Sequence, residues 1–331
     1  MVRKKLNWGI LGAAKIARSI ALALQKSKYA QPHAISSRAL PKAEAFAREY
    51  GFANSYGSYS ALLEDPDVDV VYIPLPNHLH CPWTIRALQA GKHVLCEKPL
   101  ANSASESRKM IDAAKRNHRL LMEAFMYRLH PQTLKIQELL RKGTIGVPRV
   151  IRAAFGFTLD LESKNVRLEP RMGGGCLMDV GCYCVNAIRT FFGEEPSSVI
   201  GHAKYGKRTG ADLSFAGTLI FREGKLGIFS SSFQTTLDRG VEIIGTHGRI
   251  LLPSPWKPDG TLSSFTLEIK GTSKSVEIRN GGGIYLNEVE HFSLCVMADR
   301  TPLLPSEDGF RNMVVIDALK KSARTGRETK L

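Results

Sequence analysis

The sequence predicts an α/β protein in which a doubly wound parallel sheet comes first and an α+β domain on a large open mixed or antiparallel sheet follows. Through residue 124, short apolar runs alternate with helical segments, as in a parallel sheet whose strands are joined by helices. From residue 148, the chain reads instead as long alternating strands with short turns, as in an antiparallel sheet with one buried face. We therefore expect two domains, at residues 1–126 and 127–331.

The expected elements follow from apolar periodicity and from the residues that interrupt it. In the first domain, strands are expected at 6–11, 32–38, 68–74, 93–96 and 119–124, and helices at 19–26, 41–50, 62–67, 83–90 and 103–117. In the second domain, strands are expected at 149–158, 198–203, 213–222, 224–234, 239–245, 248–252, 264–270 and 274–279, and helices at 132–142, 286–298 and 308–324. The last helix could pack back on the first domain.

Composition limits the classes of function. The chain has 331 residues, 43% of them apolar and 23% charged, which is ordinary for a globular protein, and no apolar stretch is long enough to span a membrane. Its net charge of +15 is spread along the chain, without the aromatic-interleaved basic stripe of a nucleic-acid-binding surface. We interpret the charge as solubility plus attraction for phosphates. A small-molecule substrate is expected, and a nucleic-acid partner is not.

The cysteines and the N-terminus point to a cytoplasmic protein. Six cysteines are too few for a disulfide framework in a chain of this length. The N-terminus is basic but lacks the apolar core of a signal peptide. Cys182 and Cys184 do not have the spacing of a zinc motif, so no metal site is expected.

A strand, a small-residue turn and a helix open the chain, which is the context of a dinucleotide-binding Rossmann fold. The turn is Gly12-Ala-Ala-Lys-Ile-Ala17, in which alanines replace the second and third glycines of the usual fingerprint. Small side chains still allow a pyrophosphate to approach the backbone, and the N-terminus of the helix offers it N–H groups. The predicted phosphate contacts are Gly12, Ala13, Ala14, Lys15 and Ile16.

The end of the second strand predicts the type of cofactor. An Asp or Glu at this position would bind the ribose 2′-hydroxyl of NAD, but this chain carries Ser37 and Arg38, with Lys42 one turn later. Hydroxyl and guanidinium groups would bind a 2′-phosphate, so we expect NADP(H) rather than NAD(H). The ends of the next two strands lie at the same edge of the sheet and add candidate cofactor contacts: Pro74, Leu75, Asn77, His80, Glu97 and Lys98.

Lys98 occupies an informative position in the predicted sheet. Pro99 cannot donate to a sheet ladder, so Glu97 and Lys98 lie at the carboxyl end of a buried strand, where open parallel sheets bind ligands. A lysine held there could donate a proton or tune a neighbouring acid. The alternative is an ordinary surface salt bridge between Glu97 and Lys98.

A second candidate lies on a helix opened by three glycines, residues 173–175. Asp179 and Tyr183 are four residues apart, which places them on one face of an α-helix, one turn from each other. A carboxylate beside a phenol is unusual on a half-buried helix. The alternative is a tyrosine packed on the core and an aspartate favoured by the helix dipole.

Four motifs together resemble the glucose–fructose oxidoreductase/inositol dehydrogenase (Gfo/Idh/MocA) family over essentially the whole chain. They are Trp8–Ala17, Glu97–Pro99, Glu123–Pro131 and Gly173–Tyr183. Tyr183 stands where many members have histidine, and it resembles the branch of NADP-dependent aldose 1-dehydrogenases and trans-1,2-dihydrobenzene-1,2-diol dehydrogenases. The resemblance implies that Lys98, Asp179 and Tyr183 surround the nicotinamide. It also implies a homodimer or homotetramer formed through the C-terminal sheet.

These residues suit hydride transfer between the nicotinamide and a sugar or a related cyclic polyol or diol. Oxidising a hydroxyl requires a base, and an ammonium such as Lys98 would favour the phenolate form of Tyr183. Asp179 would orient the substrate hydroxyls or Lys98. Weaker candidates for substrate contact are Arg128, His130 and Arg167. A non-catalytic NADP-binding sensor or scaffold is the alternative function, and a deoxysugar-pathway reductase is a further alternative within the enzyme class.

Overall fold

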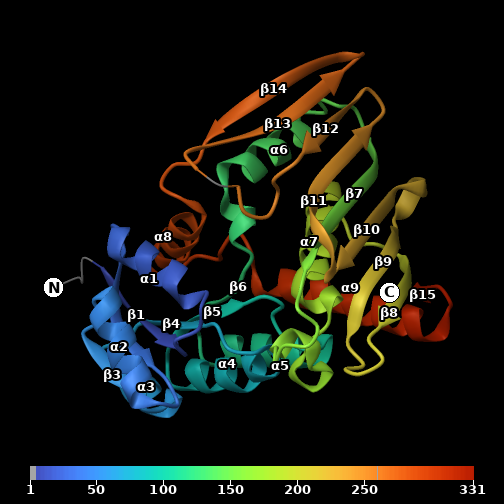
Figure 1. Cartoon of the computed structure of the whole chain (residues 1–331). Coiled ribbons are helices and arrows are strands. Elements are labelled where there is room, and N and C mark those ends of the chain that lie inside the picture. The colour runs from blue at the N-terminus through green and yellow to red at the C-terminus, as the bar shows by residue number, and fades with distance from the viewer. Residues whose placement is uncertain (1–4, 259) are drawn as a thin grey trace. The chain divides into compact units, whose positions relative to one another are not determined.

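The computed structural model describes residues 5–258 and 260–331, which form two compact units (Figure 1). Unit 1 contains the residues up to Leu129 together with Gly282–Phe310. Unit 2 contains His130–Gly281 together with Arg311–Leu331. Each unit is built around its own sheet.

Unit 1 has a six-stranded parallel sheet with the strand order β3-β2-β1-β4-β5-β6. This is the order of a doubly wound dinucleotide-binding fold, which confirms the predicted fold class of the N-terminal part. The strands are β1 Leu6–Leu11, β2 Ala30–Ser36, β3 Asn54–Tyr56, β4 Val70–Ile73, β5 His93–Glu97 and β6 Leu121–Ala124. The connecting helices are α1 Ala17–Lys26, α2 Leu40–Tyr50, α3 Tyr59–Glu64, α4 His80–Gln89 and α5 Ala104–Arg116.

Local sequence explains where these elements begin and end. Strand β4 reads Val-Val-Tyr-Ile and is buried throughout, as expected of a β-branched central strand. Ser58 and Ser103 cap helices α3 and α5 by accepting a backbone N–H from the first helical turn. Gly51 ends α2 in the left-handed conformation. Short connections of this kind align the carboxyl ends of the strands at one edge of the sheet.

Helix α8 (Ile284–Met297) packs into unit 1 although it is distant from it in sequence. The indole Nε1 of Trp8 on β1 donates to Ser293 Oγ at 3.2 Å, and its ring meets Phe292 edge-on with centroids 6.1 Å apart. Trp8 and Phe292 are fully buried. This arrangement differs from the expected division, which assigned every residue after 126 to the second domain. The buried contact between the two aromatic rings is the physical reason.

Unit 2 has a nine-stranded sheet with the order β14-β13-β12-β11-β7-β10-β9-β8-β15. All neighbouring strands are antiparallel except β7 and β10, which run parallel, so the predicted mixed sheet is confirmed. The strands are β7 Pro148–Thr158, β8 Ser198–Tyr205, β9 Asp212–Ile220, β10 Leu226–Ser232, β11 Gln234–Gly245, β12 Gly248–Leu252, β13 Leu262–Ile269, β14 Thr272–Arg279 and β15 Thr329–Lys330.

Helices cover one face of this sheet. Figure 1 shows α7 (Cys182–Phe192) lying along β7 and β10, which it contacts. Helix α9 (Ser306–Thr325) begins in unit 1, and its residues from Arg311 onward belong to unit 2. Gly201 on β8 lets α9 approach closely, because a Cβ there would lie 2.9 Å from the carbonyl oxygen of Leu319. Helix α6 (Pro131–Arg141) also belongs to unit 2.

Several short elements were not expected from the sequence, among them the strands β3 and β15 and the turn η5. Strand β3 has only three partly buried residues, so it lacks the apolar run that predicts a strand. The π-helical turn η5 (Leu177–Gly181) precedes α7, where the spacing of apolar residues predicted a regular α-helix. Within residues 5–258 and 260–331, none of the helices combines the length and the apolar character that a bilayer crossing requires.

Candidate active site

The turn after β1 lies at the point where the strand order of the sheet reverses. Gly12 has φ +106° there, and its N–H donates to Ser36 O at 2.9 Å, which ties the ends of β1 and β2 together. A Cβ on Gly12 would lie 3.0 Å from Leu75 Cδ2, so the turn and the loop after β4 are in contact. Ala13 and Ala14 are half-buried, and Lys15 is exposed. Ile16 precedes α1 without a side-chain cap, and the first-turn N–H groups of Ala17 and Ser19 donate to Ala14 O at 3.1 Å and to Ile16 O at 3.0 Å.

The end of β2 carries the predicted 2′-phosphate contacts. Arg38 and Lys42 are exposed, whereas Ser37 is 8% exposed and its N–H donates to Tyr56 O at 3.0 Å. Tyr59 forms a side-chain hydrogen bond with Arg38, and burial raises the pKa of Tyr59 against the opposing effect of that cation. The ring of Tyr59 also meets Trp83 edge-on at 5.0 Å. Tyr59 was not among the expected contacts, because no local pattern in the sequence links residue 59 to residue 38.

His80 holds two turns of this edge together. Its Nδ1 lies 2.9 Å from Pro99 O and its Nε2 lies 2.7 Å from Leu75 O. The side chain is fully buried, and burial lowers its pKa to about 4. Because the neutral ring has one N–H, His80 donates to one of these carbonyl oxygens and only contacts the other. Both ring nitrogens lie against carbonyl oxygens, and the cofactor contact expected of His80 remains a prediction. Of the other residues expected in this loop, Pro74 and Leu75 are buried and Asn77 is half-buried.

Glu97 ends strand β5, and the half-buried Lys98 follows it, as predicted. The Oε1 of Glu97 accepts a hydrogen bond from the hydroxyl of Tyr72 at 2.5 Å, and its Oε2 accepts the N–H of Lys98 at 3.2 Å. Burial first, and then the charge of Glu97, raises the pKa of Tyr72 well above its usual range. Burial and Glu97 likewise raise the pKa of Glu288 on α8. Glu97 thus belongs to a buried acidic network that anchors the backbone before Lys98.

In unit 2, the glycine-led segment is folded onto the short 3₁₀ turn η3 (Val166–Leu168). The N–H of Gly175 donates to Arg167 O at 2.8 Å, and the N–H of Gly174 donates to Glu169 O at 3.0 Å. A Cβ on Gly174 would lie 2.6 Å from Arg167 O, so the close approach requires glycine.

Asp179 and Arg167 form an ion pair in this segment. Arg167 Nε lies 2.7 Å from Asp179 Oδ2, and the two side chains are 42% and 15% exposed. The N–H of Asp179 donates to Gly175 O at 3.0 Å. The structure thus brings together two residues that the sequence predicted separately, one as a catalytic residue and the other as a substrate contact.

Tyr183 lies in the first turn of α7 within a cluster of three aromatic rings. Its ring centroid is 5.5 Å from that of Phe155 and 5.6 Å from that of Trp256, and these two rings stack on each other at 5.7 Å. The side chain is 5% exposed, and Trp256 is fixed by a hydrogen bond from its Nε1 to Ala154 O at 3.1 Å. Phe155 and Trp256 were not among the expected site residues, because they come from distant parts of the chain.

Arg128 and His130 have structural contacts. Arg128 Nη1 lies 3.2 Å from Asp308 Oδ2, in an ion pair that is mostly buried. His130 Nδ1 caps helix α6 by accepting the N–H of Gln132 at 3.2 Å, and burial lowers its pKa. Neither contact supports the expected role in substrate binding, which remains a prediction for both residues.

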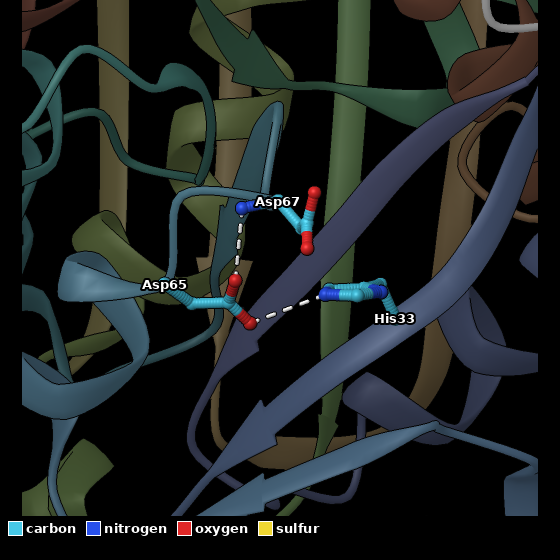
Figure 2. A group of neighbouring side chains, drawn as sticks. All are labelled: His33, Asp65 and Asp67. Atoms are coloured by element: carbon cyan, nitrogen blue, oxygen red, sulfur yellow. Dashed lines mark hydrogen bonds and ion pairs between the residues drawn. The ribbon is translucent and has the colours of Figure 1, made fainter.

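A cluster of His33, Asp65 and Asp67 also offers atoms of the kind that bind metals, all within 4.8 Å of one another (Figure 2). Asp65 already accepts the hydroxyl of Tyr56 at 2.9 Å and the N–H of Asp67 at 2.9 Å, and it lies 3.1 Å from His33 Nε2. Burial opposes the ionisation of Asp65, but these donors outweigh it and lower its pKa. We therefore interpret the cluster as a set of hydrogen bonds that stabilises the loop before β4.

Two regions of the chain match known families of protein domains. Residues 6–125 match the family described as "Oxidoreductase family, NAD-binding Rossmann fold". Residues 133–251 match the "GFO/IDH/MocA C-terminal domain". The chain belongs to the Gfo/Idh/MocA oxidoreductase family. The resemblance noted in the sequence is confirmed.

Curated members of the Gfo/Idh/MocA family match nearly the full length of the chain. D-xylose 1-dehydrogenase (NADP(+)) 2 of Haloferax volcanii is 37% identical over 98% of this chain and 100% of its own. Trans-1,2-dihydrobenzene-1,2-diol dehydrogenase of Xenopus tropicalis is 36% identical over 88% of this chain and 89% of its own. These relatives are oxidoreductases of the predicted branch, and they give no support to the alternative of a non-catalytic sensor.

Solved structures of the Gfo/Idh/MocA family agree with this fold. The aldose-aldose oxidoreductase of Caulobacter crescentus, complexed with glycerol, has a TM-score of 0.92 at 30% identity and covers 99% of this chain and 100% of its own. A 3-ketoreductase of Actinomadura kijaniata, in complex with NADP and TDP-benzene, has a TM-score of 0.91 at 28% identity over 96% of this chain and 98% of its own. Solved variants of that reductase include one with a lysine replaced by alanine and one with a tyrosine replaced by phenylalanine.

Proposed function

We propose that this protein is an NADP-dependent oxidoreductase that transfers a hydride between the nicotinamide and a sugar or a related cyclic polyol or diol. Membership of the oxidoreductase family supports the reaction class. The names of the relatives support the substrate class, because they act on D-xylose, a dihydrodiol, aldoses or a keto-sugar. Both aldose oxidation at C1 and keto-sugar reduction fit these substrates.

The observation that carries the proposal is the helix η5–α7. It presents Asp179, oriented by its 2.7 Å ion pair with Arg167, and Tyr183, held among Phe155 and Trp256. A carboxylate and a phenol fixed in this way are a hydroxyl-orienting group and a candidate acid–base group. We assign the proton transfer to Tyr183 and the orientation of substrate hydroxyls to Asp179.

Lys98 completes the proposed catalytic set. A phenol of pKa about 10 is a weak base near neutral pH, and a positive charge favours its phenolate form. We assign this charge to Lys98, whose backbone is fixed by the buried network around Glu97. The nicotinamide supplies or accepts the hydride when it is bound.

The cofactor is proposed to be NADP, held by the turn at Gly12 and by Ser37, Arg38 and Lys42 at the end of β2. The exposed cations there suit a 2′-phosphate, and related proteins are named for NADP or were solved with it. Replacing Arg38 with Asp should reverse the ratio of kcat/KM for NADP over NAD. An unchanged ratio would refute the assignment of Arg38.

The test of function is turnover of NADP(H) with a panel of aldoses, keto-sugars and cyclic diols. On the active substrate, Lys98→Met and Tyr183→Phe should each lower kcat by about 100-fold or more. Because both residues serve one proton transfer, the double variant should lose little more than the worse single variant. The exposed residues Lys109 and Tyr205 provide matched controls, since Lys109→Met and Tyr205→Phe should retain full activity. Full activity of Lys98→Met or Tyr183→Phe would exclude the assigned role.

The assembly is proposed to be a homodimer or homotetramer formed through the face of the nine-stranded sheet that α7 does not cover. Ile200 and Ile228 are 36% and 40% exposed, and a hollow of about 690 Å³ lined by residues from β7 and β9–β13 lies on the same sheet. Ile228→Glu should shift the mass measured by light scattering to that of a monomer. Leu22→Glu, a matched change at an exposed residue of α1, should leave the mass unaltered.

A cytoplasmic location remains part of the proposal, and cell fractionation tests it.

A further inference from the structure

A carboxylate from the neighbouring sheet caps the helix that carries Asp179 and Tyr183. Asp212 is the first residue of β9, and its Oδ2 accepts the N–H of Leu177 at 2.7 Å. The same oxygen lies 3.3 Å from Cys176 Sγ, which donates to it. Leu177 begins the turn η5, where backbone N–H groups have no partner within the helix. A negative charge at this end of a helix is favourable, because the N–H groups give it a partial positive charge.

Gly175 leaves room for the carboxylate of Asp212 because it has no side chain. Its φ is +112°, and a Cβ on it would lie 1.9 Å from Asp212 Oδ1. No side chain fits at residue 175 while Asp212 keeps its contact with Leu177. The conformation of the glycine and the position of the carboxylate therefore depend on each other.

The same backbone is held from its other side by Arg167. The carbonyl oxygen of Arg167 accepts the N–H of Gly175 at 2.8 Å, and the carbonyl oxygen of Gly175 accepts the N–H of Asp179 at 3.0 Å. A continuous chain of contacts thus runs from Asp212 through residues 175–177 to Asp179. Any shift of this backbone moves Asp179 relative to its ion-pair partner.

We infer that Asp212 is a positioning residue that fixes the turn carrying Asp179, an inference that rests on the role proposed for that turn. Asp212 acts through the backbone and is not assigned any contact with substrate or cofactor. Its removal should therefore lower kcat while the KM for NADP stays unchanged.

The variants Asp212→Ala and Asp212→Asn separate positioning from mere stability. In the full chain, Asp212→Ala should lower kcat by about 10- to 100-fold, as expected of a small displacement of a catalytic group, with the KM for NADP within twofold of wild type. Asp212→Asn keeps an oxygen that can accept the N–H of Leu177, so it should recover most of the lost kcat. Ser214→Ala removes a hydroxyl hydrogen bond from the same strand and should leave kcat unchanged. If Asp212→Ala and wild type have equal kcat, the inference is overturned.

Amide hydrogen exchange gives a readout that does not depend on turnover. Asp212→Ala should accelerate exchange in peptides covering residues 175–183, with no change in peptides of β1 to β6. If the wild-type protein turns over none of the tested substrates, the proposed function fails, and unchanged exchange would still overturn the positioning role of Asp212 on its own. If Asp212→Ala yields no folded protein, Gly175→Ala disturbs the same contact from the opposite side. Normal kcat and exchange in that variant would also overturn the inference.

Discussion

Arg167 makes two separate contacts with one short segment. Its carbonyl oxygen accepts the N–H of Gly175, and its guanidinium pairs with Asp179. The first contact belongs to the backbone and survives any substitution at residue 167. The second belongs to the side chain alone, so mutation of Arg167 tests the ion pair without disturbing the glycine turn.

Arg167→Ala should change activity much more than stability. The pair is partly exposed, so its loss should cost less than about 1 kcal/mol in the free energy of unfolding. Asp179 loses its fixed orientation, and kcat/KM for the active substrate should fall about tenfold. Arg152→Ala, which breaks the exposed pair with Glu242, is the matched control and should leave kcat/KM unchanged. A large drop in melting temperature with unchanged kinetics would show that Arg167 is only structural.

The half-buried side chain of His93 should make the free energy of unfolding depend on pH. Its Nδ1 accepts the N–H of Leu120 at 3.0 Å, which requires a neutral ring, and burial lowers its pKa to about 4. An unfolded histidine has a pKa of about 6.5, so between pH 6.5 and 4 the unfolded state binds more protons. The contribution of His93 is therefore complete above pH 6.5 and is lost as the pH falls towards 4.

Urea denaturation at pH 7, 5.5 and 4 measures this effect. The free energy of unfolding should fall by on the order of 1–2 kcal/mol from this residue, after allowance for its partial exposure. The fall should be smaller by that amount in His93→Asn. Parallel pH profiles for the two proteins would contradict the assignment.

Residues at strand ends were the most predictable part of the site. Pro99 has no N–H to donate to the sheet, so β5 must end before it. The position of Lys98 at the end of the strand can therefore be predicted from the sequence. The role of His80 could not be predicted in this way. Its two carbonyl partners, Leu75 O and Pro99 O, belong to different loops, and only the folded sheet brings them to opposite sides of the ring.

At the scale of elements, the glycine-led turn depends on the absence of side chains. Gly174→Ala would place a methyl group 2.6 Å from Arg167 O and 2.8 Å from Val166 O, both of which are backbone atoms. The variant should lose about 1–3 kcal/mol of stability and most of its activity. Thermal unfolding and kcat measure the two effects. Gly240→Ala on β11, where the nearest atom would lie 3.8 Å away, is the control and should be nearly neutral. Equal behaviour of the two variants would argue against this account of the turn.

The regular elements were predictable, whereas the irregular ones were not. Strand β1 was expected at 6–11 and is observed at Leu6–Leu11, because an apolar run bounded by a glycine turn is a local signal. The turn η5 has no such signal, since its apolar spacing also fits an α-helix. Its form depends on contacts from Arg167 and Asp212, which come from elsewhere in the chain.

At the scale of the whole molecule, each unit is assembled from two stretches of sequence. The sequence predicted both sheets but not the return of α8 to the first one. The reason is that Trp8 and Phe292 are separated by nearly the entire chain, so no periodicity connects them. The packing of these two buried rings places α8 in unit 1, and this contact can be seen only in the folded structure.

A fragment ending at Leu129 should therefore fold poorly by itself. Without α8, the indole of Trp8 loses both Phe292 and its hydrogen bond to Ser293, and buried apolar surface becomes exposed. The fragment should bind the dye ANS and lack near-ultraviolet circular dichroism. Joining residues 282–310 to it through a flexible linker should restore both properties. A cooperatively folded fragment without α8 would contradict this view of unit 1.

The turn Leu177–Gly181 has a consequence for how the sequence of this protein can vary. An α-helix advances by about 100° per residue, so one residue fewer between Asp179 and Tyr183 would rotate one side chain by about that angle relative to the other. A substitution leaves the angle between the two side chains about the helix axis unchanged, whereas an insertion or a deletion between them changes it. Engineered chains should therefore accept substitutions in this stretch far more readily than any change in its length.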